Sequence, residues 1–227
     1  MVPPIHDAAF RGAVATLRLL LESGESPDAL DGFDRTPLHF LCRSVKDATR
    51  HHAACFKLLR DAGANLEASD SIGYRPLHCA VCGGSVELLS LLVQSGVNVD
   101  AATNHGVTAL HVAARRVLSS AFDCIEVLLA AGASLDARMS QYGMSLRPFD
   151  MAVTRPYHRM WPLFLRAGAE IPTDNTEPYI VRVRNAGGWK KYEQAHLARV
   201  TSILETPLLP PELVRKVLEF WLHAGYY

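Results

Sequence analysis

Four histidines recur along the chain and are the first residues to consider as chemical groups. They are His6, His39, His78 and His111, which follow one another at intervals of 33, 39 and 33 residues. Imidazole nitrogens bind zinc and act as general bases near neutral pH, so such an array would suit a metal site or catalysis. Whether the array serves chemistry or structure depends on the segments that carry it.

One of these histidines, His78, is followed directly by Cys79-x-x-Cys82, which is half of a zinc or redox motif. A structural zinc site needs four ligands, typically from two such pairs, and the sequence offers no partner pair. Cys79 and Cys82 also stand where small apolar residues pack. We therefore expect both thiols to lie in a core rather than to bind metal.

A second candidate is the adjacent pair His51-His52, with Cys42, Asp47 and Cys55 nearby in the sequence. Neighbouring residues on a helix point to different sides, so this pair chelates poorly from one helix face. We expect a solvated loop here, and transient metal binding is the alternative.

Motifs for nucleotide binding and for hydrolysis are absent from the sequence. There is no G-x-x-x-x-G-K-[ST], G-x-G-x-x-G, G-x-S-x-G or H-E-x-x-H pattern. The carboxylates Asp28, Glu67, Asp100 and Asp136 recur at predicted hairpin starts, where acidic side chains stabilise turns. We therefore predict no catalytic residue, no metal ligand and no cofactor, and we predict that the protein is not an enzyme.

The composition is that of a globular protein without a strongly charged partner. The 227 residues contain 23 Lys plus Arg and 23 Asp plus Glu, a formal net charge of zero. A basic excess would be expected for nucleic-acid binding, and a bilayer span would need about 20 consecutive apolar residues. The first residues lack the pattern of a signal peptide, and the five cysteines indicate reduced thiols. We expect a monomer in the cytoplasm, with the nucleus as a second compartment, and neither nucleic acid nor membrane as a partner.

Repeats supply the elements that must position these residues. A Thr-Pro-Leu-His pattern stands intact at 36–39 and recurs in variant form around residues 6, 78, 111 and 150. Each copy precedes a leucine-rich or apolar run closed by glycine. The spacing is 33 residues, lengthened in two units by insertions near 43–52 and 116–121. Gly73 and Gly106 stand at the predicted hairpin turns, where positive φ is needed, and Asp34 takes the same place in the preceding hairpin.

A 33-residue period with Thr-Pro-Leu-His and a closing glycine resembles the ankyrin repeat, over about residues 3–171. The resemblance implies an all-α solenoid of about five helix-turn-helix units with β-hairpin loops. Stacking such units buries apolar faces that single short helices cannot cover. It also implies that the recurring histidines tie loop backbone to helix backbone, within and between repeats.

The binding surface of such a solenoid is expected at the hairpin tips and on the inner helices, which form one concave face. Aromatic and apolar side chains on exposed tips are typical of surfaces that bind a protein partner. The alternative is that these rings fold onto neighbouring hairpins. The predicted partner-binding residues are Phe33, Arg35, Ile72, Tyr74, Arg75, His105, Val107 and Tyr142.

The ankyrin-repeat domain is predicted to cover residues 1–171. We expect a linker over 172–188, with a short strand at 179–184 where apolar and charged residues alternate. A C-terminal helical hairpin is predicted over 189–227, with helices at about 189–205 and 210–222. One hypothesis is that this hairpin caps the apolar face of the last repeat.

A second hypothesis gives the hairpin a partner of its own. Residues 209–218 resemble the opening of an F-box, Leu-Pro-x-Glu-Leu followed by apolar positions, although the SOCS-box Leu-Cys signature is missing. Ankyrin arrays joined to such tails serve as substrate receptors of cullin-type ubiquitin ligases. The candidate adaptor-docking residues are Leu209, Pro210, Leu213, Val214, Val217 and Leu218.

The predicted function is therefore non-catalytic recognition of a protein partner through the hairpin tips and the concave face. The alternative is a substrate receptor of a cullin-type ubiquitin ligase, with the C-terminal segment docking an adaptor subunit. The sequence does not name the partner, because repeat scaffolds set specificity through side chains that vary freely on a constant frame.

Overall fold

A computed structural model describes residues 3–44, 50–116, 120–141, 144–154, 160–173, 175–204 and 216. The chain divides into two compact units, Met1–Met151 and Ala152–Tyr227, and each is described by itself.

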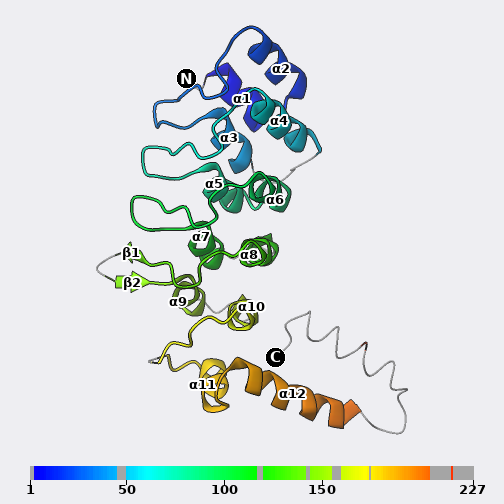
Figure 1. The fold of residues 1–227 in the computed structure, drawn as a ribbon, viewed down its shortest axis with the longest axis vertical. Helices are drawn as coiled ribbons and strands as arrows, with labels where there is room; N and C mark the ends of the chain where they lie inside the picture. The colour runs from blue at the N-terminus through cyan, green and yellow to red at the C-terminus, as the bar shows by residue number, and fades with distance from the viewer. Residues whose placement is uncertain are drawn as a thin grey trace. The chain divides into compact units, whose positions relative to one another are not determined.

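The first unit is a stack of helix pairs joined by long hairpin loops. One row holds the first helix of each pair, a second row holds the second helix, and the loops project from the first row (Figure 1). The pairs are α1 (Pro4–Phe10) with α2 (Val14–Glu22), α3 (Pro37–Arg43) with α4 (Arg50–Asp61), α5 (Pro76–Gly83) with α6 (Val86–Gln94), and α7 (Ala109–Arg115) with α8 (Ser120–Ala130). The expected all-α solenoid is confirmed.

Apolar side chains on the facing sides of these short helices make the core. Leu38 and Leu41 of α3 and Leu88, Leu89 and Leu92 of α6 have no exposed surface. A seven- or nine-residue helix is marginal alone, so its stability comes from packing against the neighbouring repeat. The repeats therefore fold as a stack and not as separate units.

The local sequence sets where each helix begins and how each hairpin turns. Proline stands in the first turn of α1, α3 and α5, where its missing N–H costs nothing. At the hairpin turns, Gly73 and Gly106 have φ of 84° and 76°. Asp34 has φ of 59° and is the only non-glycine residue with positive φ in the described part of the chain. The prediction that Asp34 replaces a turn glycine is confirmed.

The fourth hairpin is regular enough to form a small antiparallel sheet. Strand β1 (Met139–Gln141) pairs with β2 (Met144–Leu146), with Met139 opposite Leu146. The hairpin before it contains a single bridge, between Ala102 and Thr108. Helix α9 (Pro148–Val153) follows β2, and its last two residues belong to the second unit, which begins at Ala152.

The second unit contains α10 (Trp161–Arg166), α11 (Pro178–Asn185) and α12 (Trp189–Leu204). The strand predicted over 179–184 is wrong: these residues are helical in α11, so the segment 172–188 contains a helix where a linker was expected. Pro178 opens the helix, and Ile180 and Val183, three residues apart, are both fully buried on one face.

The helix predicted over about 189–205 is confirmed by α12. The second predicted helix, over 210–222, lies outside the described residues except for Lys216, which is helical. The boundaries of the predicted domains stay predictions.

Candidate protein-binding surface

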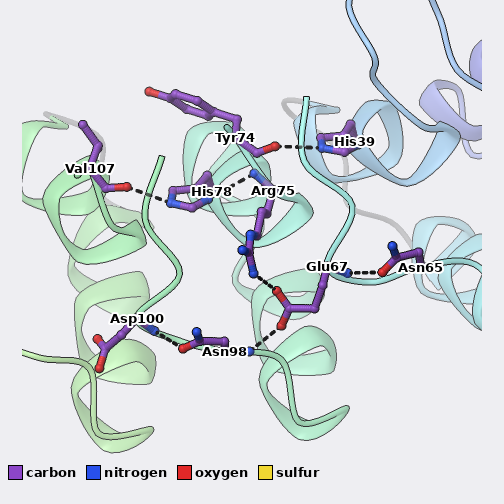
Figure 2. A network of polar contacts seen from close by, with 9 residues as sticks. All are labelled: His39, Asn65, Glu67, Tyr74, Arg75, His78, Asn98, Asp100 and Val107. Atoms are coloured by element: carbon purple, nitrogen blue, oxygen red, sulfur yellow. Dashed lines mark hydrogen bonds and ion pairs between the residues drawn. The ribbon is translucent and has the colours of Figure 1, made fainter. Parts of the chain in front are cut away.

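The recurring histidines connect one repeat to the next. In α3, His39 accepts a hydrogen bond at Nδ1 from the Thr36 backbone N–H at 3.1 Å. A backbone N–H can only donate, so the ring proton must lie on Nε2, which donates to the Tyr74 carbonyl oxygen at 3.0 Å. Figure 2 shows this contact reaching from α3 to the next hairpin. Burial lowers the pKa of His39, because the charged ring would lose its hydration.

The same bridge recurs at the other repeats. His78 accepts from the Arg75 backbone N–H at 3.2 Å and donates to the Val107 carbonyl at 3.0 Å. Burial lowers the pKa of His78 to about 4, so the ring is neutral near pH 7. His111 bonds the Thr108 N–H and the Leu146 carbonyl, and His6 bonds the Arg35 carbonyl. The structural role expected of these histidines is confirmed.

The fifth repeat replaces histidine by Asp150, and a carboxylate closes the same local turn. Asp150 Oδ2 accepts the Arg147 backbone N–H at 2.9 Å and also pairs with the Arg147 guanidinium at 3.0 Å. A carboxylate cannot donate, so it does not reproduce the Nε2 contact of the histidines to the next loop.

The acidic column of the hairpins has a different role from the one predicted. Asp28, Glu67 and Asp100 each accept a backbone N–H of the following repeat, at 2.9, 2.5 and 2.7 Å. Turn stabilisation comes instead from the residue two positions earlier: Asn65 Oδ1 accepts the Glu67 N–H at 2.9 Å, and Asn98 Oδ1 accepts the Asp100 N–H at 3.0 Å (Figure 2). The column therefore joins repeats to one another.

The cysteines lie in or beside the apolar core. Cys42, Cys55, Cys79 and Cys124 are buried as free thiols, and Cys82 is half-buried. Burial raises the pKa of Cys79 to about 12 and that of Cys55 and Cys124 to about 11. These thiols are therefore protonated near neutral pH, and the core packing expected of Cys79 is confirmed.

The solvated loop expected at His51-His52 is wrong. Both residues lie in α4, and His52 is only 6% exposed. Its Nε2 is 3.0 Å from Ser44 Oγ, and a Cβ on Gly12 would lie 3.1 Å from its ring. The sequence spacing could not show this, because the ring packs against the corner of the preceding repeat. No group of three or more His, Cys, Asp or Glu side chains suited to a metal occurs among the described residues.

Three predicted tip residues reach into solvent from well-fixed backbone. Phe33 is 63% and Ile72 55% exposed, and His105 is also exposed. Their carbonyl oxygens accept N–H groups of the next hairpin, from Ser71 at 3.1 Å, Asn104 at 3.3 Å and Ser140 at 3.0 Å. Met144 of the fourth hairpin is 55% exposed as well. The hairpins thus form a continuous ladder that holds apolar side chains outward.

Four of the other predicted residues are half-buried and have partners within the repeats. Arg35 pairs with Asp31 at 2.6 Å, and Arg75 pairs with Glu67 at 2.5 Å. The Tyr74 ring lies 5.4 Å from the His78 ring, centroid to centroid. Val107 supplies the carbonyl that His78 bonds. The alternative that these rings fold onto neighbouring hairpins stays a prediction, because the Tyr74 ring packs on a helix of its own repeat and the Phe33 ring lies 5.0 Å from the Arg35 guanidinium. Tyr142 lies outside the described residues.

The sequence analysis missed a further column on the inner helices. The residue four positions after each bridging histidine lies one helical turn further along the same helix, and these residues are Phe10, Arg43, Cys82 and Arg115. Phe10 is 45% exposed, Arg43 and Arg115 are exposed, and Cys82 is half-buried. The constant spacing from the histidines is a signal that could have identified them. We call this column, together with the hairpins that border it, the inner face.

Stacked helix pairs, hairpin loops and bridging histidines define a repeat solenoid that presents one extended surface. The family model described as ankyrin repeats (3 copies) matches residues 5–99 and 45–139, which is more than half of the chain. The protein therefore belongs to the ankyrin-repeat family, as its sequence predicted. Ankyrin repeats are modules of protein–protein interaction.

Several curated relatives match part of the chain. "SH3 and multiple ankyrin repeat domains protein 2" of Homo sapiens is 32% identical over 149 residues, 66% of this chain and 8% of its own length. "B-cell lymphoma 3 protein homolog" of Mus musculus is 29% identical over 140 residues, 60% of this chain and 30% of its own. "Putative E3 ubiquitin-protein ligase XBAT31" of Arabidopsis thaliana is 30% identical over 152 residues, which cover 61% of this chain and 31% of its own length. The chain thus spans less than a third of each relative.

The remaining predicted site, the adaptor-docking residues, lies wholly outside the described residues: Leu209, Pro210, Leu213, Val214, Val217 and Leu218. Within the described part of the chain, no helix is long and apolar enough to cross a membrane.

Proposed function

We propose that this protein is a non-catalytic scaffold that binds a protein partner through its hairpin tips and its inner face. The observation that supports this most directly is the exposure of Phe33, Ile72 and Met144 on three different hairpins. Exposed large apolar side chains on one repeating frame are typical of protein-binding surfaces.

The fixed backbone beneath these side chains favours binding. Each of the first three tips is held by the next hairpin, through the carbonyls of Phe33, Ile72 and His105. A surface that is already ordered loses little conformational entropy when a partner binds, so more of the contact energy appears as affinity. Apolar and aromatic anchors on such a surface are the residues expected to dominate binding.

The test is affinity capture from cell extract with the purified full chain and a Phe33→Ala, Ile72→Ala, Met144→Ala variant. We expect the variant to lose the captured partner by tenfold or more while its thermal midpoint stays within about 2 °C, because exposed residues contribute little to folding. Leu19→Ala is the matched control, since Leu19 is 65% exposed on α2, away from the hairpins. Equal capture by all three proteins would contradict the proposal.

The second candidate function is that of a substrate receptor of a ubiquitin ligase. It is favoured by the F-box-like residues 209–218 and by a relative named as an E3 ubiquitin-protein ligase, whose alignment covers 61% of this chain. The same capture experiment tests this second function when it is repeated with a Leu213→Glu, Val217→Glu variant. A cullin-adaptor subunit retained by the full chain and lost by this variant would support the receptor. No adaptor in the full-chain capture would count against it.

A further inference from the structure

Helix α5 packs between α3 and α7 on the inner face. Arg43 is the last residue of α3, Cys82 is the penultimate residue of α5, and Arg115 is the last residue of α7. Helices α5 and α3 approach so closely that a Cβ on Gly83 would lie 2.6 Å from the Cys42 carbonyl oxygen and 3.5 Å from Arg43 Cα. Residues of three repeats thus share one small area of the inner face.

This area carries positive charge that the described residues do not offset. Arg43 and Arg115 are exposed, and Arg116 beside them is half-buried. Among the described residues, no carboxylate lies within 4 Å of these three guanidinium groups. By contrast, Arg35 and Arg75 of the adjoining hairpins are both paired with acidic side chains. We call Arg43, Arg115 and Arg116 the basic cluster.

Cys82 lies near all three arginines of the basic cluster and does not neutralise them. Arg116, Arg43 and Arg115 are all close enough to favour the thiolate electrostatically. Burial has the larger effect, however, and the pKa of Cys82 stays raised. The sulfur is therefore an uncharged thiol near neutral pH and adds no negative charge to the basic cluster.

Two aromatic side chains border the same area. Tyr74 packs on His78, and its hydroxyl is near enough to Cys82 and Arg115 for their charges to affect its pKa. Phe10, in the same column as Arg43, is 45% exposed.

The position of arginines at the ends of α3 and α7 also suits the helix dipoles. That interaction involves the helix carbonyls and leaves the outer sides of the guanidinium groups open to a partner.

We propose that the inner face from Phe10 to Arg116 binds an extended, acidic segment of the protein partner, with its carboxylates on the basic cluster and an apolar side chain against Tyr74 or Phe10. The proposal rests on the proposed function and specifies the chemistry of the partner. Arg43 and Arg115 are two helix-to-helix steps apart, about 16–20 Å. An extended chain spans that distance in about five or six residues, so we expect two acidic positions with this separation.

The test is selection from a phage-displayed library of random 12-residue peptides on the full chain at 50 mM and 300 mM salt. We expect the enriched peptides to be rich in Asp and Glu, and their affinity to fall at least fivefold at the higher salt. An Arg43→Gln, Arg115→Gln variant should bind them at least fivefold more weakly. The matched control is Arg18→Gln, Lys57→Gln, which removes two exposed charges from α2 and α4.

Enriched peptides without an acidic excess, or no enrichment at all, would overturn the proposal. So would equal binding by the arginine variant and the wild type. A single-stranded 12-nucleotide DNA that displaces the acidic peptides at equal concentration would mean that the basic cluster recognises nucleic acid instead. Capture of a partner that needs Phe33 and Ile72 but not Arg43 and Arg115 would leave the proposed function standing and remove this inference alone.

Discussion

Histidine acts in this protein as a two-ended hydrogen-bonding group. His39, His78 and His111 each accept a backbone N–H at one nitrogen and donate to a carbonyl of the next repeat at the other. Only the neutral ring can do both, because the charged ring has two donors and no acceptor. The same residues that suggest metal chemistry in the sequence therefore depend on staying uncharged and buried.

This requirement predicts how stability depends on pH. His78 has a folded pKa of about 4, whereas the unfolded chain takes up a proton near pH 6.5. The unfolded state then binds more protons between these values, so the free energy of unfolding should fall as the pH drops from 6.5 to 4, by about 3 kcal/mol for this residue. Urea unfolding at pH 7.0, 6.0, 5.0 and 4.5 measures this fall in the free energy of unfolding.

His78→Ala provides the variant for that series. At pH 7 we expect it to lose about 3 kcal/mol, because the Arg75 N–H and the Val107 carbonyl both lose their partner. It should also show a shallower decline below pH 6.5. His105→Ala, at an exposed position, should match the wild type in both respects. A variant slope as steep as the wild-type slope would show that His78 does not titrate in this range.

At the scale of the elements, the contact between helices of neighbouring repeats determines which residues lie together on the inner face. The C-terminal end of α5 can reach the end of α3 only because residue 83 has no side chain. In an ordinary helix, replacing glycine by alanine stabilises by about 1 kcal/mol. At this position the packing between repeats opposes that preference.

We expect Gly83→Ala to destabilise the protein by about 1–3 kcal/mol, because its Cβ would lie 2.6 Å from the Cys42 carbonyl oxygen. Thermal unfolding measures the change. Gln94→Ala, at an exposed position of α6, is the control and should be neutral or slightly stabilising. If Gly83→Ala were as stable as the control, the two helix ends would not be in firm contact.

At the scale of the molecule, the second unit has its own small core. Trp161 of α10 is fully buried, and its ring lies 5.6 Å from that of Tyr179 in α11. Arg166 of α10 pairs with Glu193 of α12 at 3.2 Å. Helices α11 and α12 thus complete the packing of α10. This supports the hypothesis that the C-terminal segment covers an apolar surface.

Removal of residues 173–227 tests that covering role. We expect the truncated chain to lose hydrogen-exchange protection in 161–166, because Trp161 and Phe164, both fully buried in the full chain, would be exposed. Protection in α3 and α5 should change little, since those helices pack within the first unit. Unchanged protection in 161–166 would show that α10 is stable without α11 and α12.

The sequence by itself determined the repeat register, the helix pairs, the hairpin turns and the bridging histidines. These features repeat every 33 residues, and each depends on local chemistry: proline in the first turn, Asp34 or glycine at positive φ, and histidine beside the helix start. The exposed tips Phe33 and Ile72 follow from the same register.

Only the tertiary structure decided which side chains meet across repeats. It turned the acidic column into links between neighbouring loops, buried His52 against Gly12, and made 178–185 a helix through the packing of Ile180 and Val183. It also gathered Arg43, Cys82 and Arg115 into one area. These residues are up to 72 positions apart in the sequence, and their proximity depends on how tightly successive helices stack, which no local pattern specifies.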